Sequence, residues 1–162
     1  METVKKQTET YVILKVKGLD PITAYVTNYS AGEGKIVIEC YGDAWAHYWP
    51  AMGDCSLQAF FASANNDYLL TKLLSETKQT DFEGISEALQ ERGFDTCVTS
   101  DAEIAFCDKE MRECFGADWY MDLPRCHTAD YKWLGKIINA IKWAFLDEIN
   151  PHQATQNINQ KG

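Results

Sequence analysis

An aspartate and a histidine near the middle of the chain have a spacing that is compatible with catalysis. Asp43 and His47 are four residues apart, so on a helix they would share one face, where the carboxylate would raise the pKa of the imidazole. Such a pair can act as general acid and base, and Asp54 could complete a small hydrolase or nuclease site. No other catalytic group is fixed by spacing, and a histidine hydrogen-bonded to a neighbour is far commoner. We therefore expect no catalytic residue and keep a hydrolase or nuclease centred on this pair as an alternative.

Two sets of cysteines and histidines can be considered as zinc ligands. They are Cys40, His47 and Cys55, and, later in the chain, Cys107, Cys114, Cys126 and His127. Structural zinc sites normally use ligands in pairs two to four residues apart, because one short loop must present both in tetrahedral geometry. Neither set contains such a pair, and the chain has no glycine-rich phosphate-binding motif. We expect no metal, no cofactor and reduced cysteine thiols.

The negative charge of the chain is concentrated in one segment. The formal net charge is −9, and residues 81–122 carry twelve acidic and three basic side chains, which accounts for all of it. The solvated outer faces of two helices would explain this pattern, but such a segment is also suited to a partner with a basic surface. The carboxylates that we expect to bind this partner are Glu83, Glu87, Glu91, Asp95, Glu103, Asp108, Glu110, Glu113 and Asp118.

Direct binding of nucleic acid is less well supported by the composition. Lys15, Lys17 and Lys35 can give a sheet a mildly basic face. Tyr25 and Tyr29 are available on the same segment for stacking on bases. The chain has no arginine cluster, and lysines that protect a sheet edge from aggregation explain the pattern as well. We therefore expect protein binding to be the main activity and nucleic-acid binding to be an alternative.

The first forty residues are expected to form an antiparallel sheet. Residues 11–17, 22–29 and 35–41 are rich in β-branched and aromatic side chains, which favour strands. Glycine and proline mark turns at residues 18–21 and 30–34. Three strands joined by short turns predict a meander.

The remainder of the chain changes to a helical period. Asp54 or Ser56 can cap the first helix. Residues 80–83 and 100–103 each fit a capping box, in which a hydroxyl and a carboxylate three residues later bind free backbone amides. Residues 129–149 are expected to form the longest helix. The sequence therefore predicts an α+β fold, with a three-stranded antiparallel sheet packed against four to five helices.

The length of the chain is typical of one domain. We expect residues 1–162 to form a single domain, in which residues 1–9 and 151–162 are flexible tails. The first residues contain no apolar stretch typical of a signal peptide, and no apolar run approaches the ~18 residues that a membrane span requires. These features predict a cytoplasmic protein without a membrane partner.

Residues 19–75 contain a motif rich in glycine and tryptophan, from Gly42 to Gly53, that resembles a family of small proteins encoded by bacteriophages and prophages. The motif is G-x-A-W-x-x-Y-W-x-x-M-G, followed by an aromatic helix and a D-Y-L sequence. Its carriers here are Gly42, Ala44, Trp45, Tyr48, Trp49, Met52, Gly53, Phe60, Phe61, Asp67, Tyr68 and Leu69. The resemblance implies a phage accessory protein in the cytoplasm of a bacterial host cell, and it assigns no functional residue.

The resemblance and the charge distribution lead to one functional hypothesis. We expect a non-catalytic inhibitor or modulator of a host defence complex, of the anti-CRISPR or anti-restriction type, that binds a host protein or nucleoprotein complex through its acidic surface. Trp45, Tyr48 and Trp49 are expected to form either an aromatic surface or part of the core. A homodimer is left open. The alternatives are a phage DNA-metabolism accessory that binds nucleic acid directly and the small hydrolase or nuclease described above.

Overall fold

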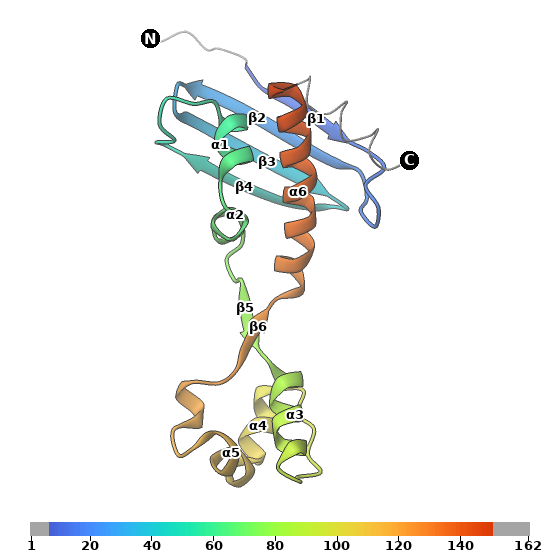
Figure 1. Cartoon of the computed structure of the whole chain (residues 1–162), viewed down its shortest axis with the longest axis vertical. Coiled ribbons are helices and arrows are strands. Elements are labelled where there is room, and N and C mark those ends of the chain that lie inside the picture. The colour runs from blue at the N-terminus through green and yellow to red at the C-terminus, as the bar shows by residue number, and fades with distance from the viewer. Residues whose placement is uncertain (1–6, 151–162) are drawn as a thin grey trace. The chain divides into compact units, whose positions relative to one another are not determined.

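The chain is divided by its internal contacts into two units. The computed structural model describes residues 7–150 (Figure 1). Unit 1 consists of residues 1–75 and 129–162, and unit 2 consists of residues 76–128, which are inserted between them in the sequence. Most of the predicted tails lies outside the described residues.

Unit 1 contains a four-stranded antiparallel sheet in the order β1-β2-β3-β4. The strands are β1 (Glu9–Ile13), β2 (Ile22–Ser30), β3 (Glu33–Cys40) and β4 (Asp43–Trp49). Alternation determines which face is buried: Ile22, Ala24 and Val26 point inward, while Thr23 and Tyr25 point outward. The α+β class is confirmed, but the predicted number of strands is wrong. The fourth strand is formed by the aromatic motif, where we considered a helical pair.

The first strand is shorter than predicted. It ends at Ile13, so Lys15 and Lys17 lie beyond it, and Lys15 has a positive φ of 61°. Tyr11 and Ile13 pack against the core. The predicted extension of this strand to residue 17 is therefore wrong, because the regular strand ends at Ile13, Lys15 has a left-handed conformation and residues 17–18 form the turn.

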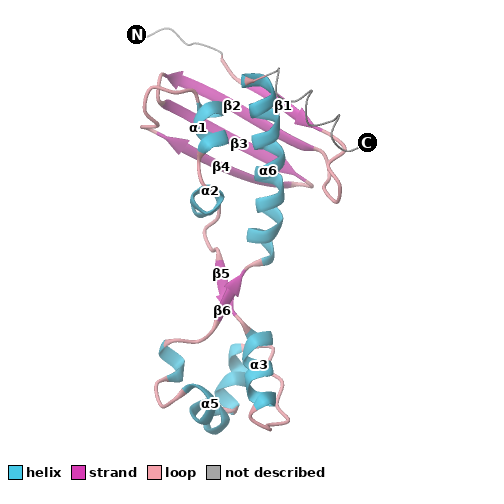
Figure 2. Ribbon diagram, viewed as in Figure 1, coloured by secondary structure: helices cyan, strands magenta, loops and turns pink. Residues whose placement is uncertain are grey.

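The described part of unit 1 also contains three helices. Figure 2 shows two of them, α1 and α6, on one face of the sheet. The three helices are α1 (Leu57–Ser63), α2 (Asn66–Leu73) and α6 (Ala129–Ile149). Ser56 caps α1 by accepting a hydrogen bond from Ala59 N, as its position before an apolar stripe predicts. The long helix α6 has the predicted bounds. Phe61 and Phe145 are fully buried and meet edge to face at 5.8 Å, so α1 and α6 share one core above the sheet.

Unit 2 has its own core and a short two-stranded ribbon. Its elements are β5 (Lys78–Thr80), α3 (Phe82–Glu91), α4 (Asp101–Phe106), α5 (Asp108–Phe115), the 3-10 helix η1 (Trp119–Met121) and β6 (Arg125–His127). The two strands pair antiparallel, with Gln79 opposite Cys126. The buried hydrophobic residues of this unit are Ile85, Leu89, Val98, Ile104 and Met111. Each unit therefore has a separate hydrophobic core, and that the chain behaves as a single domain stays a prediction.

Two capping predictions in unit 2 have different outcomes. At residues 80–83 the box is not formed, because Asp81 rather than Thr80 caps α3 by accepting from Gly84 N at 3.0 Å. At the second site Ser100 accepts from Glu103 N, as predicted. The Glu103 carboxylate accepts hydrogen bonds from the backbone N–H and the hydroxyl of Thr99, the residue before the cap. These bonds stabilise the start of α4.

Candidate partner-binding surface

The acid–base pair suggested by the sequence is not formed in the structure. Asp43 and His47 lie on the same face of strand β4, but four residues of strand span ~13 Å, against ~6 Å in a helix. The ring of His47 packs edge-on against Trp49, with centroids 4.5 Å apart. Burial and the charge of Lys72 lower the pKa of His47, which is opposite to the predicted direction. Asp54 is an exposed loop residue. The geometry therefore provides no base activated by a carboxylate.

Metal binding has no support in the described part of the chain. Among residues 7–150, no three His, Cys, Asp or Glu side chains are arranged to hold a metal ion. All six cysteines are free thiols. Cys40 is buried, and burial raises the pKa of its thiol.

The open face of the sheet carries carboxylates beside its tyrosines. Tyr25 donates a hydrogen bond to Glu39 at 3.1 Å, and Tyr48 donates to Glu33. These bonds raise the pKa of both phenols. Lys35 pairs directly across from Tyr48 on this face. A nucleic acid stacked on these rings would bring its phosphates close to the glutamates, so this arrangement argues against the nucleic-acid alternative.

The aromatic motif is divided between the two faces of the sheet. Trp49 is buried, and its indole N–H donates to the Tyr68 hydroxyl at 3.0 Å. Trp45 is half-buried and packs edge-on against Trp133 at 5.2 Å. Tyr48 lies on the opposite face and is 44% exposed. The two tryptophans are therefore core residues, and only the tyrosine belongs to a surface, as the two-residue period of a strand requires.

The acidic residues are the strongest functional feature, and they coincide with one unit. Unit 2 carries thirteen acidic and five basic residues, a net charge of −8, whereas the rest of the chain has eleven acidic and ten basic residues and a net charge of −1. All nine carboxylates predicted to bind a partner lie in unit 2. Eight of them are exposed, and Glu110 is half-buried. The boundary of the charged segment is thus close to a structural boundary, which the sequence alone did not reveal.

Helix α3 presents its carboxylates as one stripe. Glu83, Glu87 and Glu91 recur every four residues and lie opposite the buried Ile85 and Leu89. Among the lysines and arginines of residues 7–150, Arg112 forms an ion pair, with Asp108. No lysine or arginine of the described chain therefore neutralises the α3 stripe at close range, and its charge is free to act on another molecule.

The carboxylates of α4 and α5 are less uniform than predicted. The helical segment that begins after the Ser100 cap is interrupted at Cys107, so that α4 and α5 are separate helices. On α5, Asp108 lies about 200° around the helix from Glu110 and so points to another side, while Glu110 and Glu113 are three residues apart and lie within about 60° of each other. The prediction of one acidic surface therefore has its best geometric support on α3.

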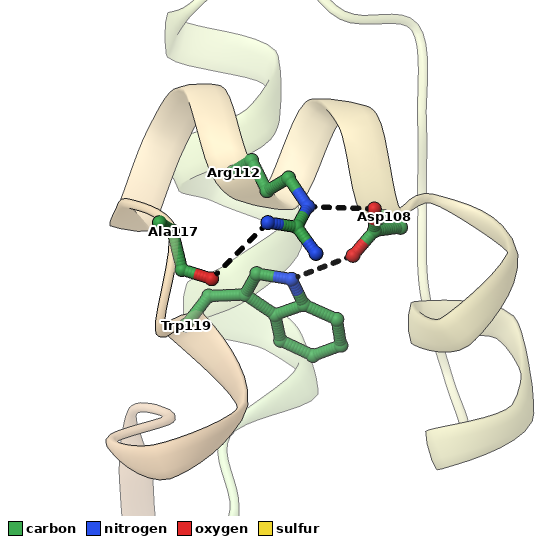
Figure 3. Close-up of polar contacts among 4 residues, drawn as sticks. All are labelled: Asp108, Arg112, Ala117 and Trp119. Carbon is green, nitrogen blue, oxygen red and sulfur yellow. Dashed lines mark hydrogen bonds and ion pairs between the residues drawn. The ribbon is translucent and has the colours of Figure 1, made fainter.

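Hydrogen bonds made by two side chains of α5 stabilise the segment that follows this helix (Figure 3). Arg112 donates from Nε to Asp108 Oδ2 at 2.7 Å and from Nη1 to the Ala117 carbonyl at 3.4 Å. The Trp119 indole N–H donates to Asp108 Oδ1 at 3.0 Å. These bonds, led by that from Arg112, lower the pKa of Asp108. One carboxylate therefore holds both the last turn of α5 and the start of η1.

Replacing the carboxylate of Asp108 should remove a pH-dependent contribution to the stability of unit 2. A lowered pKa in the folded state stabilises the fold fully above the ordinary value of 3.8, and this stabilisation is lost as the pH falls through the lowered pKa. Asp108→Asn is therefore expected to lower the melting temperature at pH 6, with a difference from wild type that shrinks below pH 3.8. The Trp119 indole N–H resonance should follow the same titration. A difference in melting temperature that is constant with pH would contradict this role.

The fold and the surface define a class: an α+β protein with a helix-covered antiparallel sheet and an inserted acidic helical unit. The chain matches the phage family Phage_phiTE_072 over residues 1–146 and belongs to that family. No curated protein and no solved structure matches the chain significantly. The predicted resemblance to phage proteins is confirmed at this level, and the chain is a phage accessory protein. Within the described residues, no helix is long and apolar enough to cross a membrane.

Proposed function

We propose that this phage protein acts without catalysis, as an inhibitor or modulator of a host defence complex of the anti-CRISPR or anti-restriction type. Its partner is a host protein or nucleoprotein complex with a basic surface, in the cytoplasm of the bacterial cell. Unit 2 makes the contact through carboxylates that imitate a row of phosphates. The observation that supports this proposal most directly is the charge of −8 on a separate unit, together with an α3 stripe that has no lysine or arginine of residues 7–150 within 4.0 Å.

The spacing of the α3 carboxylates is compatible with mimicry of nucleic acid. Residues four apart on a helix are separated by ~6 Å along its axis, which is close to the distance between successive phosphates of one nucleic-acid strand. A protein that binds DNA or RNA presents lysines and arginines to such a row, and the resulting attraction increases the rate of association as well as its specificity. These charges lie on a unit that has a hydrophobic core of its own.

The proposal is tested by reversing the stripe. Cells with an active CRISPR or restriction system should allow a targeted phage to form more plaques when they express the wild-type chain. Glu83→Lys, Glu87→Lys and Glu91→Lys combined should abolish this protection. Binding to the affected complex should weaken at least about 100-fold, because like charges across an interface cost several kcal/mol and about 1.4 kcal/mol is tenfold.

A matched control separates this effect from a general change of charge. Asp43, Asp54 and Asp147 are exposed carboxylates of unit 1, and their combined replacement by lysine changes the net charge by the same amount. This variant should protect the phage as the wild type does. If both triple variants behave alike, or if the wild type protects against neither system, the proposed function is wrong.

A further inference from the structure

A groove lies in unit 2 between α3 and the segment that follows it. Its volume is about 470 Å³, and it lies within the unit that carries the acidic surface. It is lined by Phe82, Glu83, Ser86, Glu87, Gln90, Cys97, Val98 and Thr99. The lining is therefore apolar at Phe82 and Val98, and acidic along one wall.

The two walls of the groove are fixed to each other by a buried serine. The hydroxyl of Ser86 accepts a hydrogen bond from Val98 N at 3.0 Å and lies 3.2 Å from Val98 O. Ser86 and Val98 are both buried. This link holds the extended segment 94–99 at a set distance from α3, so the groove is a feature of the folded unit.

The charge of the groove requires a cationic occupant. Glu83 and Glu87 are exposed, and no lysine or arginine of the described chain lies within 4.0 Å of them. Next to these carboxylates, the half-buried ring of Phe82 can cover the aliphatic stem of a long basic side chain. Arginine suits this arrangement better than lysine, because its planar guanidinium binds a carboxylate through two parallel hydrogen bonds.

The spacing of the carboxylates indicates which arrangement of arginines fits. Glu83 and Glu87 are ~6 Å apart along the axis of α3. In an extended peptide, side chains on the same face are two residues apart and separated by ~6.6 Å. Two arginines separated by one residue therefore match the two glutamates, whereas adjacent arginines point to opposite faces.

We infer that this groove binds an extended basic segment of the partner, with the pattern arginine–any residue–arginine, and that Glu83 and Glu87 each bind one guanidinium. This inference rests on the proposed function, because it names the chemistry of the partner that the acidic unit contacts. It adds a position on the surface and a sequence pattern for the partner, neither of which follows from net charge.

Two short peptides of equal composition test the pattern. The probe is acetyl-Gly-Arg-Ala-Arg-Gly-amide, and the control is acetyl-Gly-Arg-Arg-Ala-Gly-amide. Titration of the full-length ¹⁵N-labelled chain should shift amide resonances of residues 82–90 and 97–99 with the probe. The control should bind about fivefold more weakly, which corresponds to the loss of one ion pair at the upper end of the range for exposed pairs. Equal affinity for both peptides, or shifts spread over all acidic helices, would overturn the inference.

Variants that separate shape from charge complete the test. Glu83→Gln with Glu87→Gln should reduce binding of the probe to the level of the control. Asp54→Asn with Asp147→Asn removes the same number of exposed carboxylates from unit 1, outside the lining of the groove, and should not change it. Cys97→Trp fills the groove without altering the charge and should abolish binding, and Cys97→Lys should do the same by placing a cation at its mouth. Circular dichroism confirms that each variant is folded.

The two proposals fail in different ways. If Cys97→Trp still protects a targeted phage while the triple lysine variant does not, the groove is not the contact and the acidic surface remains the active feature. If the peptide pattern is confirmed but neither triple variant affects plaque formation, the groove binds a basic segment outside the context of host defence.

Discussion

Replacement of Gly32 by alanine is expected to leave little folded protein. Gly32 has φ = +78°, and an added Cβ would lie 1.9 Å from the carbonyl oxygen of Gly53. A residue other than glycine costs ~1–2 kcal/mol in this conformation before any clash is considered. The clash itself is with backbone, which cannot rotate away as a side chain can. The turn between β2 and β3 must therefore move.

This movement would also break the attachment of the loop before α1. Gly32 N donates to Cys55 O at 3.0 Å, and Met52 N donates to Gly32 O at 2.7 Å. Each lost hydrogen bond costs ~1 kcal/mol, and strain and clash add to it. The expected total of several kcal/mol is a large part of the ~5–15 kcal/mol by which domains are stable. Urea unfolding followed by tryptophan fluorescence measures this change.

Gly42→Ala is the matched control for this prediction. Gly42 also has a positive φ, +85°, but a Cβ there would meet no atom within 4 Å. It should therefore show only the conformational cost of ~1–2 kcal/mol. If Gly32→Ala is no more destabilising than Gly42→Ala, the backbone at Gly32 does not lie in close contact with the carbonyl of Gly53.

Phe61→Ala is expected to have the second-largest effect and to act on unit 1 alone. The ring of Phe61 is fully buried and packs against Trp49 and Phe145, with centroids 6.4 Å and 5.8 Å away. Removing a ring of this kind costs ~3–5 kcal/mol, because it leaves a cavity that the surrounding sheet and helices cannot fill. Hydrogen exchange should show faster exchange of amides in the β2 and β3 strands and in α6.

The same measurement decides whether the chain unfolds as one domain. The core of unit 2 is formed by other residues, including Leu89 and Met111, and none of them belongs to the cluster around Phe61. We therefore expect amides of α3 and α5 to keep their protection. Phe106→Ala is the control, since Phe106 is 89% exposed and its loss should change stability by less than ~0.5 kcal/mol. Equal loss of protection in both units would show that they unfold together.

Features that depend on neighbouring residues were predictable from the sequence. The strands from residue 22 and residue 35 follow from β-branched and apolar alternation, and both are present as β2 and β3. The helix at 129–149 and the Ser56 and Ser100 caps depend on spacings of three or four residues, which are visible in the chain. The concentration of charge in residues 81–122 is likewise a property of composition.

The candidate site was predictable in its residues but not in its geometry. The sequence identified Glu83 and Glu87 from charge alone. It gave no sign of the groove beside them, because the groove depends on Ser86 binding Val98, twelve residues further along the chain. Neither a serine in a helix nor a valine in a loop has a sequence signal that indicates such a bond, whose partners are brought together only by folding.

The sequence by itself determined the local elements, the caps and the location of the acidic charge, since each depends on residues within about one helical turn. The tertiary structure decided that residues 76–128 form a separate unit. Strands of three residues at 78–80 and 125–127 pair across a separation of 47 residues, too short and too distant for any periodic pattern to predict. The tertiary structure also determined how far apart Asp43 and His47 lie. Residues four apart share a face in both a helix and a strand, but only pairing with β3 fixed the strand and its longer rise, which keeps the two side chains apart.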